Sequence, residues 1–316
     1  MRVTSKDEFA DIAEAFNLMS EKMDRYTSNL ILLNDKYVKF VPSEIFKLIG
    51  KDKITQVHLH DYKTITMNVL YLTFNLSCRD AFNFKSEKEM FDALNTSYES
   101  FFGVVEKNSG VVHSFGSLGA TILFPKASQD AFNASVQFKE IFINDQIKKH
   151  MNMTLGSGEV LIGISGNKKR RGVVVVSDQL MQLFNIDSHL SSLKINHVAT
   201  ENIIKNLPQN GICNYRFIGK VSGIQGGESS VKLYEMIDMT NRYKKDLYIS
   251  TKELFEKAVD VYTSGEFEEA RKLFSDVLKV NNKDSVAVNY LMKCDEQINA
   301  TDDSFNRKKW TGNLFD

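Results

Sequence analysis

The chain of 316 residues contains very few cysteines and prolines. Its three cysteines, Cys78, Cys213 and Cys294, lie far apart in sequence and match no metal-ligand spacing. Such sparse cysteines exclude a disulfide-stabilised scaffold and favour a reducing, cytoplasmic environment. Because there are only three prolines, long proline-rich linkers between domains are not expected either.

Long apolar runs and an excess of one charge are also missing. No run of about 18 apolar residues occurs, so we expect no membrane-spanning helix in this sequence, and no signal peptide is recognisable. The 40 acidic and 40 basic residues cancel, so no overall field favours nucleic acid or an anionic membrane. We therefore expect no nucleic-acid partner. Hydrophobic residues make up 42% of the chain, which is enough for a substantial core.

The first 40 residues carry a long heptad pattern. Apolar residues recur at alternating steps of three and four, which is typical of a coiled coil. At about 1.5 Å per residue, the pattern predicts a helix on the order of 50 Å long. The residues of this seam are Phe9, Ile12, Phe16, Met19, Met23, Tyr26, Leu30 and Leu33. We expect the seam to join two chains as a homodimer, the alternative being a single amphipathic helix packed on its own domain.

The start of this helix, DEFADIAEAFNLM, resembles the second helix of a HAMP signalling module, which reads DExGxLxxxFNxM. The matching residues are Asp7, Glu8, Phe16, Asn17 and Met19, while the two residues after Glu8 depart from the pattern. The resemblance implies the cytoplasmic end of a membrane-anchored receptor. In such receptors a membrane segment and the first HAMP helix lie upstream, and neither is present in this chain.

The segment that follows, FVPSEIFKLIGKDKITQVHLHD, resembles the phrase FVPxEFLxLLGKxSIxDVxLGD that precedes bacterial class III nucleotidyl cyclase domains. Phe40, Val41, Pro42, Gly50 and Lys51 are among the matching residues. The resemblance continues through TLGSGEVLIGISGN and covers residues 41–240. It implies an α+β domain with a ferredoxin-like, mainly antiparallel cyclase sheet backed by helices.

The pattern of apolar residues fits that fold. Residues 110–125 predict a hairpin, with Gly116 and Gly119 bracketing its turn, which we expect to lie centrally in the sheet. Ser86 to Glu89 form a capping box at the start of a helix. Strands are expected at 67–74, 160–164, 173–176, 215–221 and 231–236, and those at 160–164 and 173–176 are expected to be buried.

The resemblance also shows where catalytic residues would lie. Class III cyclases use two magnesium or manganese ions, held by two aspartates, to activate the 3′ hydroxyl and to neutralise the triphosphate. Alignment on the flanking residues puts Thr73 and Leu118 at these two positions. Because a hydroxyl and an isobutyl group cannot hold hard dications, we expect no metal and no cofactor in this chain.

Four further family positions are substituted. The lysine that selects the base falls on Ser114 and its partner on Val174. The asparagine that orients the ribose falls on Met181, and the arginine that stabilises the transition state falls on Asn185. These changes predict a catalytically inactive cyclase-like signalling domain that acts through dimerisation and protein contacts.

Two alternatives stay open at this point. The chain could be a divergent active cyclase that makes cyclic AMP or cyclic GMP with other acids, such as Asp80 or Asp178, as metal ligands. It could instead bind a nucleotide as a sensor without turning it over.

Other polar clusters have weaker functional signals. His58 and His60 could share a metal on one strand face, but a solvated pair is the expectation, and His113 is expected to be a neutral packing residue. The basic run Lys168–Arg171 falls in a predicted hairpin turn. We interpret it as a solvated turn, the alternative being a docking patch for an acidic partner or a phosphate.

Residues 241–316 predict a small all-α segment. Its alternation of small and large residues resembles a tetratricopeptide helix pair, followed by a third helix at 286–298. One repeat cannot bury its apolar face alone, so we expect it to pack on the central domain and to offer a surface for a protein partner. Trp310 is expected to pin the tail. The predicted organisation is therefore a helix at 1–40, the cyclase-like domain at 41–240 and the helical segment at 241–316.

Overall fold

The computed structural model describes residues 8–40, 43–74, 85–141, 151–208, 214–222, 230–237 and 242–302. The chain divides into two compact units, Met1–Val57 and His58–Asp316. No helix among these residues is long and apolar enough to cross a membrane. The division into three parts made from the sequence stays a prediction.

The first unit is dominated by the helix α1, Glu8–Phe40. Its eight seam residues are all between 56% and 71% exposed, so a single chain leaves the seam uncovered by the residues described. The helix is confirmed, whereas its pairing in a coiled coil stays a prediction. The short helix α2, Ser43–Leu48, and the 3-10 turn η1, Ile54–Gln56, complete this unit.

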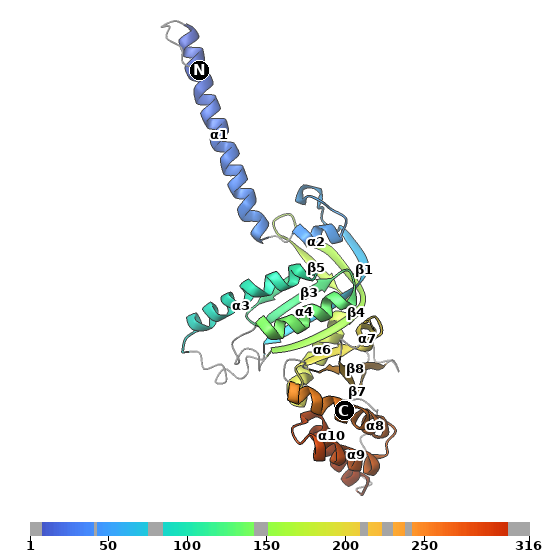
Figure 1. Ribbon diagram of the computed structural model, residues 1–316. Coiled ribbons are helices and arrows are strands. Elements are labelled where there is room, and N and C mark those ends of the chain that lie inside the picture. The colour runs from blue at the N-terminus through green and yellow to red at the C-terminus, as the bar shows by residue number, and fades with distance from the viewer. Residues whose placement is uncertain are drawn as a thin grey trace. The chain divides into compact units, whose positions relative to one another are not determined.

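The second unit is built on an eight-stranded sheet (Figure 1). The strand order is β2-β3-β1-β4-β6-β8-β7, with β5 paired to the far end of β4. All pairs are antiparallel except β4 with β6. The strands are β1 Tyr62–Phe74, β2 Val111–Gly116, β3 Gly119–Phe124, β4 Met151–Gly166, β5 Arg171–Val176, β6 His197–Thr200, β7 Tyr215–Ser222 and β8 Ser230–Met236. The predicted α+β class is confirmed.

Helices cover both faces of this sheet. They are α3 Glu87–Lys107, α4 Ser128–Ile141, α6 Asp178–Leu193 and α7 Glu201–Lys205. Side chains alternate between the two faces of β1. Leu70, Leu72 and Phe74 pack into a core with α3 and α4, where Phe101 and Phe138 stack at 4.8 Å. The intervening residues of β1 face α6, and this alternation places the candidate site on the α6 side.

The start of α3 differs in one detail from the predicted capping box. Ser86 is the N-cap, and its hydroxyl accepts a hydrogen bond from the Glu89 amide at 3.2 Å. The Glu89 carboxylate accepts from the amide of Lys85 at 2.7 Å instead of that of Ser86. The hydrogen bond to the Glu89 carboxylate therefore comes from Lys85, the residue before the N-cap, and not from the N-cap itself.

The β2–β3 hairpin forms as predicted, but its position in the sheet was predicted wrongly. Only β3 pairs with β1, so β2 is the edge strand of the described sheet and the second half of β2 is exposed. The tight turn depends on Gly119, which has φ of +142° and lies against β1 so closely that a Cβ would be 2.0 Å from the Leu72 carbonyl oxygen. The Tyr98 hydroxyl donates to the Gly116 carbonyl oxygen at 2.6 Å and fixes the hairpin to α3.

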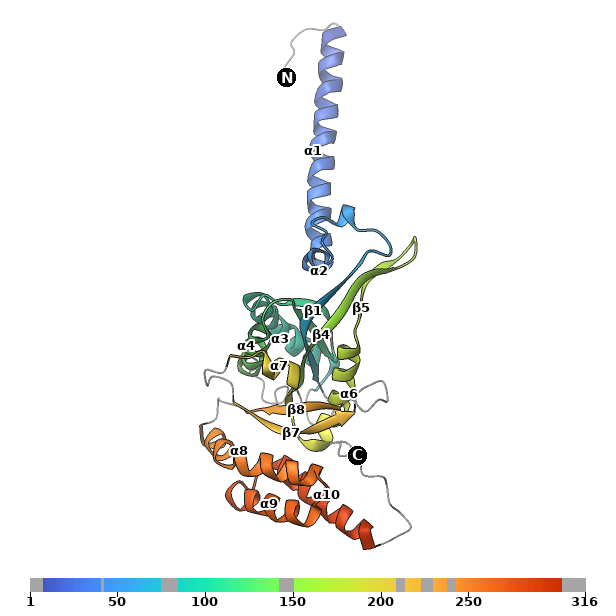
Figure 2. The same cartoon turned by 90° about the vertical axis from the view of Figure 1, so that its right-hand side faces the viewer.

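The strand β5 was predicted to be buried, and this was wrong. It pairs only with residues 161–166 at the end of β4, so the two strands form a ribbon that extends beyond the rest of the sheet (Figure 2). Val174 is 41% exposed and Val176 is 58% exposed. A short apolar run has the same composition whether it lies in the centre or at the edge of a sheet, which explains the error.

The C-terminal helices are α8 Arg242–Thr263, α9 Phe267–Val280 and α10 Ser285–Asp302. The predicted third helix is thus confirmed, although the tetratricopeptide character stays a prediction. Phe255, Phe274 and Tyr290 form their aromatic core, with Phe274 and Tyr290 stacked at 4.8 Å. The Tyr290 hydroxyl donates to the Ile218 carbonyl oxygen on β7 at 2.6 Å. Trp310 lies outside the described residues.

The end of α6 is completed by side chains from α10. The Ile195 amide donates back to the Leu190 carbonyl oxygen at 3.1 Å while Lys194 takes a left-handed φ of +55°, the pattern that commonly ends a helix. The Asn289 amide group donates to the Leu193 carbonyl oxygen at 3.0 Å, and the Ser285 hydroxyl donates to the Lys194 carbonyl oxygen at 3.4 Å. Two carbonyls at the end of α6 are therefore satisfied from a distant segment.

Candidate functional site

The end of β1 and the turn of the β2–β3 hairpin lie side by side. Thr73 is paired with Gly119 in the sheet, and the Phe74 amide donates to the Leu118 carbonyl oxygen at 2.9 Å. The fold therefore brings the two sequence-predicted metal positions, Thr73 and Leu118, to one place. The Leu118 side chain is 67% exposed and carries no donor atom for a metal.

A carboxylate from α6 contacts the first of these positions. The Thr73 hydroxyl oxygen lies 2.8 Å and 3.0 Å from the two carboxylate oxygens of Asp187, to which it donates. Burial raises the pKa of Asp187, and the hydrogen bonds from Thr73 and Asn152 oppose that rise. Asn152 is the β4 neighbour of Thr73 in the sheet. Asp187 is thus a half-buried acid held by two neutral side chains.

Aromatic residues line the space beside this contact. Tyr71 and Phe184 meet edge to face at 4.5 Å, joining β1 to α6. They border an open cleft of about 370 Å³ whose other lining residues come from the hairpin: Ser114, Phe115, Gly116, Ser117, Leu118, Gly119, Ala120 and Thr121. No lysine, arginine or histidine is among the lining residues. Burial, and then the negative charge of Asp187, raises the pKa of Tyr71, which stays a neutral phenol.

The remaining sequence-predicted positions are not all gathered in this cleft. Ser114 lines it, but Val174 lines a different hollow beside Val176 at the base of the β4–β5 ribbon. Met181 and Asn185 lie on α6 with exposed side chains and do not line the cleft. Within one chain, therefore, the structure brings together three of the six positions.

The described residues at the cleft do not fit the two metal ions that the resemblance to class III cyclases implies. Within the described part of the chain, no group of three or more histidine, cysteine, aspartate or glutamate side chains could hold a metal ion. Two hard dications require several carboxylate oxygens, whereas among the described residues Asp187 is the one acid that contacts the Thr73 hydroxyl. Asp178 lies at the exposed start of α6 and does not line the cleft, and Asp80 lies outside the described residues.

Comparison with known proteins shows similarity to adenylate cyclases. No protein-family model matches the chain. It is 23% identical over 281 residues to the adenylate cyclase of Dictyostelium discoideum described as terminal-differentiation specific, and 20% identical over 247 residues to an adenylate cyclase of Anabaena cylindrica. These alignments cover 82% and 73% of this chain but only 13% and 48% of the two relatives. The chain therefore spans at most about half of these curated relatives.

Solved structures match at the level of the fold. Two structures of a bacterial light-regulated adenylyl cyclase match 72% and 77% of this chain, and 68% and 70% of their own, with TM-scores of 0.59 and 0.54 and 12% identity. The fold is that of the class III adenylyl and guanylyl cyclase catalytic domain. The resemblance seen in the sequence is confirmed to this extent, as are the helix before the cyclase sheet and the helical segment after it.

Asp187, which contacts Thr73 beside the cleft, is the residue that the sequence analysis missed. The family positions on α6 correspond to Met181 and Asn185, whose side chains are exposed on the same helix as Asp187. A usable signal was present, because Asp187 follows the fully buried Ile186 and lies one turn beyond Leu183, on the buried side of α6. An acid next to such a stripe is unusual enough to mark a specific contact.

The three histidines considered in the sequence analysis, His58, His60 and His113, are not among the lining residues of the cleft. His58 and His60 lie in an exposed turn before β1 and not on a strand. The Asp61 carboxylate closes this turn by accepting a hydrogen bond from the His58 amide at 2.8 Å. They therefore do not share a strand face. His113 is half-buried in β2, and burial lowers its pKa, which favours the neutral ring expected from the sequence.

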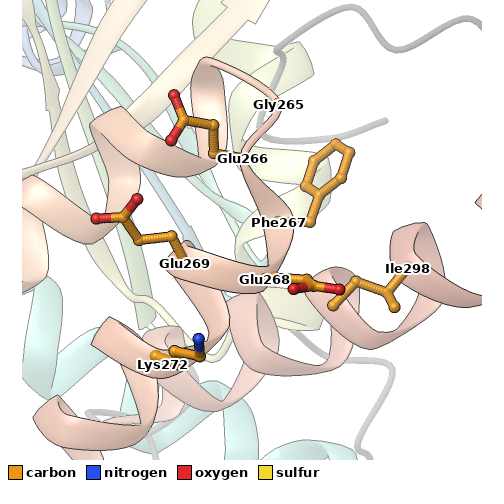
Figure 3. A pocket seen from close by; sticks show the side chains of 7 residues that line it. All are labelled: Gly265, Glu266, Phe267, Glu268, Glu269, Lys272 and Ile298. Atoms are coloured by element: carbon orange, nitrogen blue, oxygen red, sulfur yellow. The ribbon is translucent and has the colours of Figure 1, made fainter.

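A further hollow lies in the helices that follow the cyclase sheet (Figure 3). It has a volume of about 450 Å³ and lies at the start of α9 beside Ile298 of α10. Its lining residues are Gly265, Glu266, Phe267, Glu268, Glu269, Lys272 and Ile298. The hollow shares no residue with the candidate cleft.

Proposed function

We propose that this chain is a catalytically inactive cyclase-like signalling domain that acts through dimerisation and protein contacts. The observation that carries the proposal is the hydrogen bond between Thr73 and Asp187, at the place where the family holds its first metal ion. In this arrangement the carboxylate of Asp187, the one that contacts Thr73 in the part of the chain that the structure describes, is engaged by a hydroxyl and an amide. The absence of a second acid on the hairpin, where Leu118 stands, removes the other half of the metal site.

The electrostatics of the cleft argue in the same direction. Burial raises the pKa of Asp187, so this carboxyl group loses its proton, as a dication ligand must, less readily than a free aspartate does. A nucleoside triphosphate also needs positive charge around its phosphates. The described residues that line the cleft include no cation, so they support neither turnover nor binding of a triphosphate there.

A cyclase assay tests the proposal directly. Purified protein incubated with ATP or GTP and manganese should give no cyclic nucleotide. If the chain were a divergent cyclase that used Asp187 as a metal ligand, the wild type would form product and Asp187→Asn would abolish it. The exposed acid Asp92 on α3 offers the matched control, since Asp92→Asn should then leave the product yield unchanged.

Nucleotide binding without turnover is tested by thermal denaturation. A sensor present with ligand at 100 times Kd would be stabilised by about 2.7 kcal/mol. We expect no shift with ATP, GTP or their cyclic products, with or without manganese. A saturable shift that is lost in the cleft variant Ser114→Leu would support the sensor function instead.

The exposed seam of α1 supports the dimeric part of the proposal. Class III cyclases generally dimerise, and a strict heptad of apolar residues more than half exposed is stable in water only when a partner covers it. In our proposal this helix couples the domain to a HAMP-containing receptor on the cytoplasmic side of a membrane. The helices α8–α10 would then present the surface for a protein partner.

A further inference from the structure

The tip of the β4–β5 ribbon carries a charged feature that lies outside the candidate cleft. Its tip contains four consecutive cations, Lys168–Arg171, in a chain whose overall charge is zero. All four are exposed, and none forms an ion pair with another described residue. The positive charge is therefore local to this tip and uncompensated by neighbouring side chains.

The turn that presents these cations is well defined. The Asn167 side-chain oxygen accepts bonds from the amides of Lys169 and Arg170 at 2.8 Å and 2.9 Å, and the Asn167 amide donates to the Arg170 carbonyl oxygen at 2.8 Å. Gly166 has φ of +133°, and a Cβ there would lie 2.2 Å from the Arg170 carbonyl oxygen. A turn organised in this way fixes the backbone from which the four side chains extend, which lowers the backbone entropy lost when a partner binds.

The strand beside the tip has an open edge. Among the described strands β5 pairs with β4 alone, so one row of its backbone amides and carbonyls has no strand partner. Val174 and Val176 point to one face of the ribbon, where they line a shallow hollow of about 390 Å³ together with Tyr62 and Leu161. An exposed edge strand of β-branched residues is a ready template for another extended chain.

We propose that this ribbon binds an extended, acidic protein segment, which adds a strand to the free edge of β5 and places its carboxylates against Lys168–Arg171. The cations at the tip favour an acidic end on the segment. The unpaired backbone amides and carbonyls of β5 favour a polypeptide partner, which can hydrogen-bond to them as a strand. Apolar side chains at alternate positions of the segment would cover Val174 and Val176. None of the residues that carry the proposal lines the candidate cleft, although Val174 also occupies the family position that partners the base-selecting lysine.

Other polyanions fit these observations less well. Single-stranded nucleic acid is usually bound by aromatic residues between the cations, and the tip from Gly166 to Gly172 has none. The same tip has no apolar side chain to insert into a lipid layer, since the valines lie behind it. Neither ligand would use the backbone groups along the edge of β5.

The test uses the full chain and a fluorescent peptide with a run of glutamates at one end and alternating valine and threonine at the other. Both chain directions are made, because the strand could add parallel or antiparallel. We expect saturable binding of one direction by fluorescence anisotropy, with slower hydrogen exchange of the β5 amides at 172–176. A scrambled peptide of the same composition should bind at least about tenfold more weakly, because its acids and apolar residues fall out of register.

Substitutions locate the site. Lys169→Glu/Arg170→Glu should weaken binding about tenfold or more, and Val174→Ser should weaken it without any change of charge. The matched control Lys88→Glu/Lys257→Glu reverses two exposed cations on α3 and α8 and should leave the affinity unchanged.

Four results would overturn the proposal. The first is that neither peptide binds, and the second is that the scrambled peptide binds equally well. The third is that phosphatidylserine vesicles or an oligonucleotide bind in place of the peptide and lose binding in Lys169→Glu/Arg170→Glu. The fourth is self-association of the wild-type chain that Val174→Asp abolishes, which would assign this edge to a second copy of the chain.

Discussion

Arg216 and Asp284 form a completely buried ion pair that joins β7 to the start of α10. The guanidinium group donates to the two carboxylate oxygens of Asp284 at 2.5 Å and 2.9 Å, and to Glu235 of β8 at 2.8 Å. It also lies 3.8 Å from the centre of the Phe255 ring. Burial alone would lower the pKa of Arg216, but the two acids outweigh burial and raise the pKa above its ordinary value.

Replacing this arginine tests how strongly the C-terminal helices are tied to the sheet. Arg216→Met should lower the free energy of unfolding by about 3–5 kcal/mol, because it leaves the buried Asp284 without its partner. Urea denaturation gives the measurement. The control is Arg271→Met, which removes an exposed ion pair with Asp295 and should cost about 1 kcal/mol or less. Equal costs for the two variants would contradict the role given to Arg216.

The pH dependence of stability reports on Asp187. Its pKa is higher in the folded state than the ordinary value of 3.8, so the folded state binds its proton more tightly than the unfolded state. The contribution of this group to stability is therefore complete below pH 3.8 and is lost as the pH rises through the raised value. Asp187→Asn should remove this loss.

Urea titrations of both proteins across the acidic range should thus show a difference that grows, in favour of the variant, as the pH increases. A difference that is constant with pH would show that Asp187 has the same pKa in both states. Asp92→Asn on α3, the exposed control, corrects for the general effect of removing one acid.

The oligomeric state depends on α1 if the seam pairs two chains. Met19→Asp/Met23→Asp places charges in the predicted interface and should convert a dimer to a monomer in light scattering at micromolar concentration. Leu18→Asp/Leu32→Asp changes two residues of the same helix that are also more than half exposed but lie outside the seam, and should leave the dimer intact. A monomeric wild-type protein would remove the coiled-coil hypothesis.

The hairpin at the cleft depends on Gly119. Gly119→Ala should destabilise the protein by about 1–3 kcal/mol, because the new methyl group would meet the Leu72 carbonyl oxygen and φ is +142°. Gly103→Ala, on the exposed side of α3 with no atom within 4 Å of the new methyl group, should stabilise by about 0.5–1 kcal/mol. Thermal denaturation of the two variants should therefore shift in opposite directions.

Much of the fold was accessible from sequence because its signals are local. The seam of α1 repeats every three or four residues, and the turn between β2 and β3 is marked by two glycines a few positions apart. The adjacency of Thr73 and Leu118 followed from flanking motifs shared with class III cyclases, and the backbone bond between Phe74 and Leu118 confirms it.

The contacts that escaped prediction join distant parts of the chain. Thr73 and Asp187 are 114 positions apart, and no periodicity within one segment can show that they meet. Arg216 was predicted only as part of a strand, since a lone arginine is ordinarily a surface residue and its partner Asp284 is 68 positions away. The exposure of β5 depends on how far its partner β4 extends past the rest of the sheet, which composition does not reveal.

The hydrogen bonds from Asn289 and Ser285 to the end of α6 affect how truncated forms of this protein should behave. A chain cut at residue 240, where the cyclase sheet is complete, would lose the donors that satisfy the final turn of α6, six residues beyond Asp187. We expect that turn to unwind and Asp187 to loosen with it. Nucleotide chemistry measured on such a fragment would then describe a site in which the contact between Thr73 and Asp187 has been disturbed, so activity should be measured on the chain that includes α10.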